Sequence, residues 1–243
     1  MEDTLVIVPC KYGPQSKIND CIASIKKNVR ADIVVIDSKS EDQSYAHKFD
    51  VPVEFIDNMN YDMGAYLVGY RKFSNYKNYI CIHDSFIFNA QFTPKKKGIT
   101  PFRTFETSRV IGGRYTIRGR RDALKFIFRS LNERAALLSY GFDTNEQLEH
   151  FDNVCSRLNM IPPISWNGIF GPIFTIDNES IQYLSNLLTQ DLLPCNKQQQ
   201  MSYERILGLV AHQNLQVRQP YWGPHFTTPL EDEKFSKFIL ARK

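Results

Sequence analysis

The first 82 residues alternate four short apolar runs with segments whose apolar residues recur every three or four positions. Continuous apolar runs of this length are typical of parallel strands that are covered on both faces. The periodic segments at 18–29 and 63–70 predict amphipathic helices between them. This order predicts an α/β fold with a mostly parallel central sheet, right-handed crossovers and helices on both faces. The four runs lie at residues 5–8, 33–36, 51–56 and 79–82.

Beyond residue 90 the pattern predicts helices more clearly than strands. Residues 91–121 are rich in Lys, Arg, Gly and Thr and indicate loops with short strands. Thr144 with Gln147 resembles a capping box, and Asp177 or Asn178 is expected to cap a later helix. Helices are predicted at 124–138, 148–158, 181–188 and 199–213, with one buried strand at 168–176 and a short helix at the C-terminus.

The chain shows no internal repeat and no linker long enough to separate two domains. We therefore expect a single domain over residues 1–243. Residues 1–90 would form one half of it, and 91–243 the other half, with a helical insertion at 91–165.

Cysteine usage and hydropathy indicate the compartment. The five cysteines are scattered, odd in number and without CxxC spacing, which favours a reducing environment over disulfides or a zinc site. The start of the chain is acidic and lacks a secretory signal, and no apolar run approaches the roughly 20 residues of a membrane-spanning helix. These features predict a soluble, cytoplasmic protein. The net charge of +4 suits anionic small molecules and is too small to indicate nucleic acid binding.

Several familiar catalytic motifs are absent from the sequence. We find no GxGxxG after the first strand, no GxxxxGK[ST], no GxSxG and no HExxH. Acidic residues at strand ends remain, since Asp37 and Asp84 each follow an apolar run. In parallel sheets, ligands bind beyond the carboxyl ends of the strands. Asp37 is therefore expected either to accept hydrogen bonds from a nucleobase or ribose, or to cap the next helix.

Four segments in a fixed order resemble the nucleotide-sugar-binding half of GT-A glycosyltransferases. The resemblance is to the broad family 2-like group and to bacterial rhamnan-synthesis-type transferases, and it covers residues 4–90 well and the rest in outline. The segments are Val8-Pro9-Cys10, residues 34–42 around Asp37, residues 58–65 and His83-Asp84-Ser85.

This resemblance implies a donor site for a nucleotide sugar. Pro9 would lie beside the base and Asp37 would contact the base or ribose. Asp62, Gly64 and Ala65 would line the donor pocket, with Gly64 permitting close backbone approach near a helix N-terminus. A cap of its own helix is the other role expected for Asp62.

The resemblance also implies a divalent cation, Mn²⁺ or Mg²⁺. His83-Asp84-Ser85 stands where the family has an Asp-x-Asp metal motif, so one carboxylate is left in place of two. Asp84 would bind the metal against the donor diphosphate, and His83 would suit Mn²⁺ better than Mg²⁺. His225 resembles a C-terminal histidine that serves some GT-A enzymes as a further ligand, or it is a surface histidine.

Catalysis with inversion needs a base for the acceptor hydroxyl, and the family places an acidic residue early in a late helix. Glu204 fits this place, and the small residues Gly208 and Ala211 on the same helix face would leave room beside it. Its alternative role is a helix-start carboxylate or an ion pair with Arg205 or Lys197. If the reaction retains configuration, Glu204 need not act as a base.

Two further features concern the acceptor. Trp166 either stacks on a sugar ring of the acceptor or packs in the core. A basic stretch would hold the donor diphosphate, steer an anionic acceptor, touch a membrane surface or simply face solvent. Its residues are Arg114, Arg118, Arg120, Arg121, Lys125 and Arg129.

Three functions are compatible with these features. The leading prediction is an enzyme that moves a hexose or deoxyhexose from a nucleoside-diphosphate sugar to a glycan or glycoconjugate acceptor. A sugar-phosphate nucleotidyltransferase is the second, although the first strand lacks the Gly-rich basic loop that it needs. A non-catalytic module on the same fold that binds nucleotides or glycans is the third.

Overall fold

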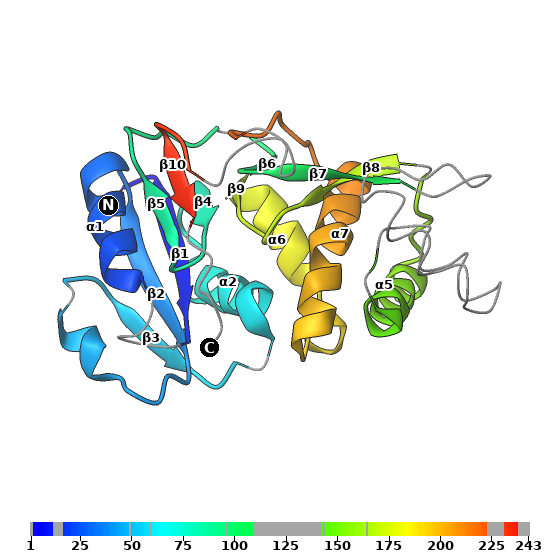
Figure 1. The fold of residues 1–243 in the computed structure, drawn as a ribbon, viewed down its shortest axis with the longest axis horizontal. Coiled ribbons are helices and arrows are strands. Elements are labelled where there is room, and N and C mark those ends of the chain that lie inside the picture. The colour runs from blue at the N-terminus through cyan, green and yellow to red at the C-terminus, as the bar shows by residue number, and fades with distance from the viewer. Residues whose placement is uncertain are drawn as a thin grey trace.

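A six-stranded sheet of order β3-β2-β1-β4-β9-β6 forms the centre of the computed structural model (Figure 1). Strands β3, β2, β1 and β4 are parallel neighbours, whereas β9 runs antiparallel to both β4 and β6. The strands are β1 (Thr4–Cys10), β2 (Asp32–Ser38), β3 (Val53–Ile56), β4 (Asn78–Cys81), β6 (Ile99–Pro101) and β9 (Phe174–Asp177). The structure describes residues 2–11, 17–48, 50–58, 60–95, 97–108, 142, 144–163, 165–222 and 231–237.

Strand β1 is buried along its whole length and divides its side chains between two hydrophobic cores. Leu5 and Ile7 belong to one core, and Val6 and Val8 belong to the other. This division follows from the alternation of side chains along a strand. It explains why the sequence shows a continuous apolar run here, and it confirms the predicted α/β class with a mostly parallel central sheet.

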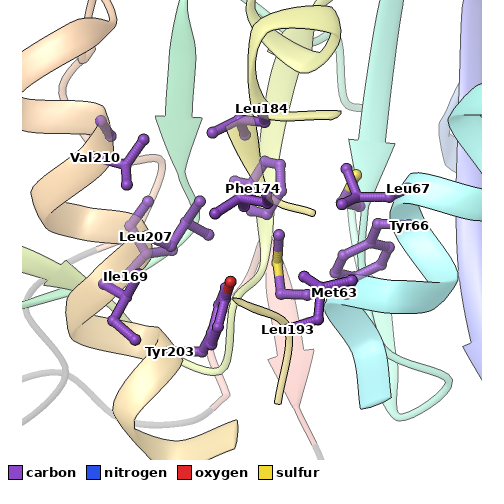
Figure 2. Close-up of a cluster of buried hydrophobic side chains, with 14 of the residues drawn as sticks. Met63, Tyr66, Leu67, Ile169, Phe174, Leu184, Leu193, Tyr203, Leu207 and Val210 are labelled. Carbon is purple, nitrogen blue, oxygen red and sulfur yellow. The ribbon is translucent and has the colours of Figure 1, made fainter. Parts of the chain in front are cut away.

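Helices cover both faces of the sheet, as predicted. Helix α1 packs in the core that contains Val6, while α2, α5, α6 and α7 contribute to the core that contains Ile7 (Figure 1). In Figure 2, side chains of α2, α6 and α7 converge around Phe174 of β9. The helices are α1 (Ile18–Asn28), α2 (Tyr61–Lys72), α5 (Asn145–Arg157), α6 (Asn178–Leu187) and α7 (Lys197–Asn214), with short 3-10 helices at Ser44–Lys48 and Gln190–Leu192.

Two of the predicted helix caps are formed. The Thr144 side chain accepts a hydrogen bond from the backbone of Gln147 at 3.3 Å, and Asp177 caps α6 through Ser180 at 2.8 Å. Among the helices that the structure describes, none combines the length and hydropathy needed to cross a bilayer. The predicted helix at 124–138 lies outside the described residues.

The prediction of a single strand at 168–176 is wrong, because this segment contributes to two strands that pair with different partners. β8 (Ser165–Ile169) pairs with β7 (Thr104–Ser108), whereas β9 joins the central sheet. Gly171 lies between them with a φ of 60°, a left-handed conformation that glycine adopts without strain and that turns the chain.

The end of the described chain also differs from expectation. β10 (Phe235–Lys237) pairs with β5 (Phe86–Phe88), so these residues form a strand where a helix was predicted, and 238–243 lie outside the described residues. Phe235 closes an aromatic cluster with Phe86, Phe88 and Phe102. Burial of these rings explains why a strand forms at this place.

The topology brings distant segments to one edge of the sheet. β1, β2 and β4 end at this edge because they are parallel, and β9 begins there because it is antiparallel. Cys81 at the end of β4 pairs with Phe174 at the start of β9. The turn that contains Gly171 therefore lies near the His83-Asp84 segment, at the carboxyl edge where ligands bind in such sheets.

Candidate functional site

Asp37 is the last residue but one of β2, and its side chain is fully buried. Its Oδ1 accepts a hydrogen bond from the backbone N–H of Ser40 at 2.7 Å, and its Oδ2 accepts one from the phenol of Tyr45. Burial, followed by the hydrogen bond to Asp37, raises the pKa of Tyr45 well above its ordinary value. The carboxylate thus holds the loop after β2 in place, and its contact with a nucleobase or ribose stays a prediction.

Asp62 joins three elements at the carboxyl edge of the sheet. Its Oδ2 lies 3.1 Å from Nε2 of His83, which follows β4, and accepts a hydrogen bond from Nε2 of Gln200 on α7 at 3.3 Å. The cap of its own helix was the alternative role, but the N-cap position is Asn60 and the Asp62 carboxylate points to His83 and Gln200 instead.

Three other predicted donor residues are buried. Pro9, Gly64 and Ala65 have little or no exposed surface. A Cβ on Gly64 would lie 2.4 Å from Oδ1 of Asn58 and 2.6 Å from Cβ of Asn60. The missing side chain therefore makes room for two amide side chains of the preceding loop. The contact of Gly64 with a donor stays a prediction.

Asp84 is half-buried in the turn after β4, one residue beyond His83. The turn lies against α1, since the Cys21 thiol donates a hydrogen bond to the carbonyl oxygen of His83 at 3.6 Å. Burial, followed by the charge of Asp84, raises the pKa of that thiol. Among the described residues, no group of three or more His, Cys, Asp and Glu side chains is arranged to hold a metal ion. Mg²⁺ and similar ions are often bound by one or two carboxylates with phosphates and water completing the shell, and Asp84 fits that mode. His225 lies outside the described residues.

Glu204 lies half-buried on α7 and reaches the same edge. Its Oε1 accepts a hydrogen bond from the backbone N–H of Gly171 at 2.8 Å. The expectation that Gly208 leaves room beside this carboxylate is wrong. A Cβ on Gly208 would lie 2.2 Å from the carbonyl oxygen of Asn167, so the backbone of β8 fills this space. Ala211 is buried as well.

Trp166 packs in the core. Only 3% of its surface is exposed, and its ring stacks on Phe151 with centroids 5.9 Å apart and planes 12° apart. Its Nε1 donates a hydrogen bond to the backbone oxygen of Arg205 at 3.1 Å. Core packing, the second of its two expected roles, accounts for these contacts. The basic stretch from Arg114 to Arg129 lies outside the described residues.

A pocket opens beside α2, and its lining includes Gly64, one of the three residues predicted to line a donor pocket, but neither Asp62 nor Ala65. It holds about 370 Å³ of open space, and two amide side chains in its wall, Asn60 and Gln190, contact each other. These residues are 130 positions apart. The sequence patterns missed Gln200, because its partner Asp62 is 138 positions away and leaves no local pattern. Tyr45 was missed although Asp37 is only eight positions away, because that spacing matches no turn or helix-cap pattern. The pocket is lined by Ile56, Asp57, Asn58, Asn60, Gly64, Leu67, Val68, Arg71, Gln190 and Leu193.

The fold and the carboxyl edge of the sheet together define an α/β protein with a mostly parallel sheet and carboxylates beyond its strand ends. No known protein family and no curated protein matches the sequence. Solved structures similar to the chain include two of S. aureus TarS. One has 20% identity over 37% of this chain and 18% of that chain, with a TM-score of 0.32. The other, TarS 1–349, has 11% identity over 98% and 60%, with a TM-score of 0.42.

A third similar structure is CMP:2-keto-3-deoxy-manno-octonic acid synthetase complexed with CTP. It has 11% identity over 89% of this chain and 88% of that chain, with a TM-score of 0.43. This chain spans less than two thirds of the length of either TarS structure. At these identities and TM-scores the similarities concern the backbone fold and do not assign an activity.

Proposed function

We propose that this protein transfers a sugar from a nucleoside-diphosphate sugar to a glycan or glycoconjugate acceptor. The observation that carries the proposal is that the segments bearing Asp62, Asp84 and Glu204 meet at the carboxyl edge of the sheet, because Asp62 contacts both His83, next to Asp84, and Gln200, one helical turn before Glu204. These segments are the start of α2, the turn after β4, and α7. The four ordered segments that resemble GT-A transferases lie on the same strand ends.

In this proposal the donor nucleoside lies over the ends of β1 and β2. Pro9 and Asp37 are nearest to the base and ribose, and Gly64 with Ala65 shapes the floor at the start of α2. Asp84 faces the diphosphate and, with His83 beside it, would hold Mn²⁺ or Mg²⁺. Such an ion supplies charge neutralisation for the departing nucleoside diphosphate.

Glu204 is the proposed base in a reaction that inverts configuration. A base must lie within hydrogen-bond reach of the acceptor hydroxyl whose proton it takes. The hydrogen bond from Gly171 holds Oε1 at the site edge. We leave Trp166 out of the acceptor site, because its ring is buried against Phe151.

A non-catalytic module that binds a nucleotide or glycan is the second candidate. It is favoured by the segment His83-Asp84-Ser85, which has one carboxylate where the Asp-x-Asp motif has two. Turnover separates the two candidates, because a binding module would bind the donor without hydrolysing or transferring it. A nucleotidyltransferase would instead release pyrophosphate from a nucleoside triphosphate and a sugar phosphate.

The test is a thermal-shift screen of nucleoside diphosphates and nucleotide sugars with and without Mn²⁺, followed by product detection. A ligand at 100 times its dissociation constant stabilises the folded state by about 2.7 kcal/mol. We expect a shift with one nucleotide class that depends on Mn²⁺ and is lost in Asp84→Ala. The matched control is Asp3→Ala, an exposed carboxylate that pairs with Lys77 at the opposite end of the sheet. No shift with any nucleotide, metal present, would refute the proposal.

A further inference from the structure

The Asp62 carboxylate lies within 3.3 Å of groups from two other segments of the proposed site. Its Oδ2 lies 3.1 Å from the imidazole of His83 and 3.3 Å from the amide nitrogen of Gln200. The side chains of Asp62 and His83 are 29% and 18% exposed, and Gln200 is 4% exposed. Contacts that are largely shielded from water are stronger than surface contacts of the same geometry.

We propose that Asp62 is a positioning residue which fixes the distance between Asp84 and Glu204, with Gln200 as its partner on α7. The inference rests on the proposed function and deepens it. His83 precedes Asp84 directly in the chain. Gln200 precedes Glu204 by one helical turn, so the two side chains lie on the same helix face. One carboxylate oxygen thereby ties the turn after β4 to the helix that carries the proposed base.

The second atom of the Gln200 amide supports this role. Its Oε1 is buried and has no hydrogen-bond partner among the described residues. A rotated amide would set that oxygen against the Asp62 carboxylate, so the contact through Nε2 determines the orientation. A buried acceptor without a partner is costly and calls for an explanation. The link between α2, the turn after β4 and α7 provides one.

The proposal differs from a direct donor contact in what a mutation should change. If Asp62 positions Asp84 and Glu204, Asp62→Ala misplaces the reacting groups while the nucleotide still binds. Small misplacements of catalytic groups lower turnover by as much as about 100-fold. We therefore expect a kcat that is about 10- to 100-fold lower, with the KM for the donor changed less than about threefold.

Gln200→Met tests the partner, because methionine keeps the length of the side chain and removes the hydrogen bond. We expect a loss of kcat similar to that of Asp62→Ala, and little further loss in the double variant, since residues that act through one contact are not additive. Asp62→Asn, which still accepts a hydrogen bond from Gln200, should retain most of the activity. Asp3→Ala is again the matched control.

Hydrogen exchange gives a measurement that does not depend on activity. In Asp62→Ala and in Gln200→Met, amide exchange should accelerate both in residues 82–86 and at the start of α7, with no change in the Asp3→Ala control. A raised donor KM with unchanged kcat, additive losses in the double variant, or exchange that accelerates in one segment alone would each overturn the inference. If the wild type binds no nucleotide sugar while both segments still respond together, the proposed function fails and the structural link stands.

Discussion

A close approach of two backbones is testable by adding one methyl group to Gly208, a helical glycine. This glycine lies on α7 where the helix crosses β8, and a Cβ there would lie 2.2 Å from the carbonyl oxygen of Asn167 and 2.8 Å from Cα of Gly168. Ordinary contact begins near 3.4 Å, so α7 and β8 would have to separate by roughly 1.2 Å. Both obstructing atoms belong to the backbone and cannot rotate away.

The expected net loss follows from two opposing contributions. Overpacking costs about 1–3 kcal/mol, and a clash with rigid backbone belongs near the upper end of that range. Replacing glycine by alanine inside a helix returns about 1 kcal/mol through helix propensity. We therefore expect Gly208→Ala to lower the free energy of unfolding by about 2 kcal/mol. With a urea m-value of about 3 kcal/mol per M, the midpoint falls by roughly 0.7 M.

Gly69→Ala is the matched control in urea unfolding followed by circular dichroism. Gly69 is also a buried helical glycine, but its Cβ would meet the Cγ2 methyl of Ile7 at 2.8 Å, a longer approach and one to a side chain instead of a backbone carbonyl. We expect a change within about 1 kcal/mol, because the smaller clash and the gain in helix propensity nearly cancel. Equal midpoints for the two variants, or no loss for Gly208→Ala, would refute the argument from backbone contact.

Two further predictions concern buried polar groups. Tyr45→Phe leaves Oδ2 of the buried Asp37 without its phenol donor, and urea unfolding should show a loss of about 1.5–3 kcal/mol; a change below 0.5 kcal/mol would contradict this. Burial lowers the pKa of His150, partly opposed by Glu146, so the folded state binds fewer protons than the unfolded state. The contribution of neutral His150 to the free energy of unfolding should then be complete above the unfolded pKa of about 6.5 and decline as the pH falls below it. Unfolding measured from pH 8 to pH 5 should show a smaller decline for His150→Phe, and equal declines would show that His150 plays no part.

The first half of the fold could be predicted from sequence because its signals are local. The apolar runs that became β1, β2 and β4 are buried almost throughout, and each covers a span that one strand can fill. The run that became β3 forms a strand at the end of the sheet, where its residues are only partly buried or exposed. The N-caps at Thr144 and Asp177 were predictable for the same reason, since a cap and its partner lie three residues apart.

The expectations that failed depended on partners that are distant in the chain. Residues 168–176 form one apolar run in the sequence, yet they divide between β8, which pairs with β7, and β9, which pairs with β4. Gly208 was expected to leave room beside Glu204, but the backbone of β8 packs against it. The hydrogen bond between Gln200 and Asp62 joins residues 138 positions apart, so no local sequence pattern predicts it.

The pairing of β4 with β9 has a consequence for how the chain acquires its structure. Partners in this ladder are 93 to 99 positions apart, so joining them closes a long loop at an entropic cost of about 4 kcal/mol. The parallel strands β1 to β4 are joined by shorter connections and can assemble earlier during synthesis. Until residue 177 has left the ribosome, the outer edge of β4 keeps its backbone N–H and C=O groups unpaired, beside the apolar side chains of Ile80 and Cys81. An exposed edge of this kind can pair with another nascent chain, so a shortened chain that ends before β9 is expected to aggregate.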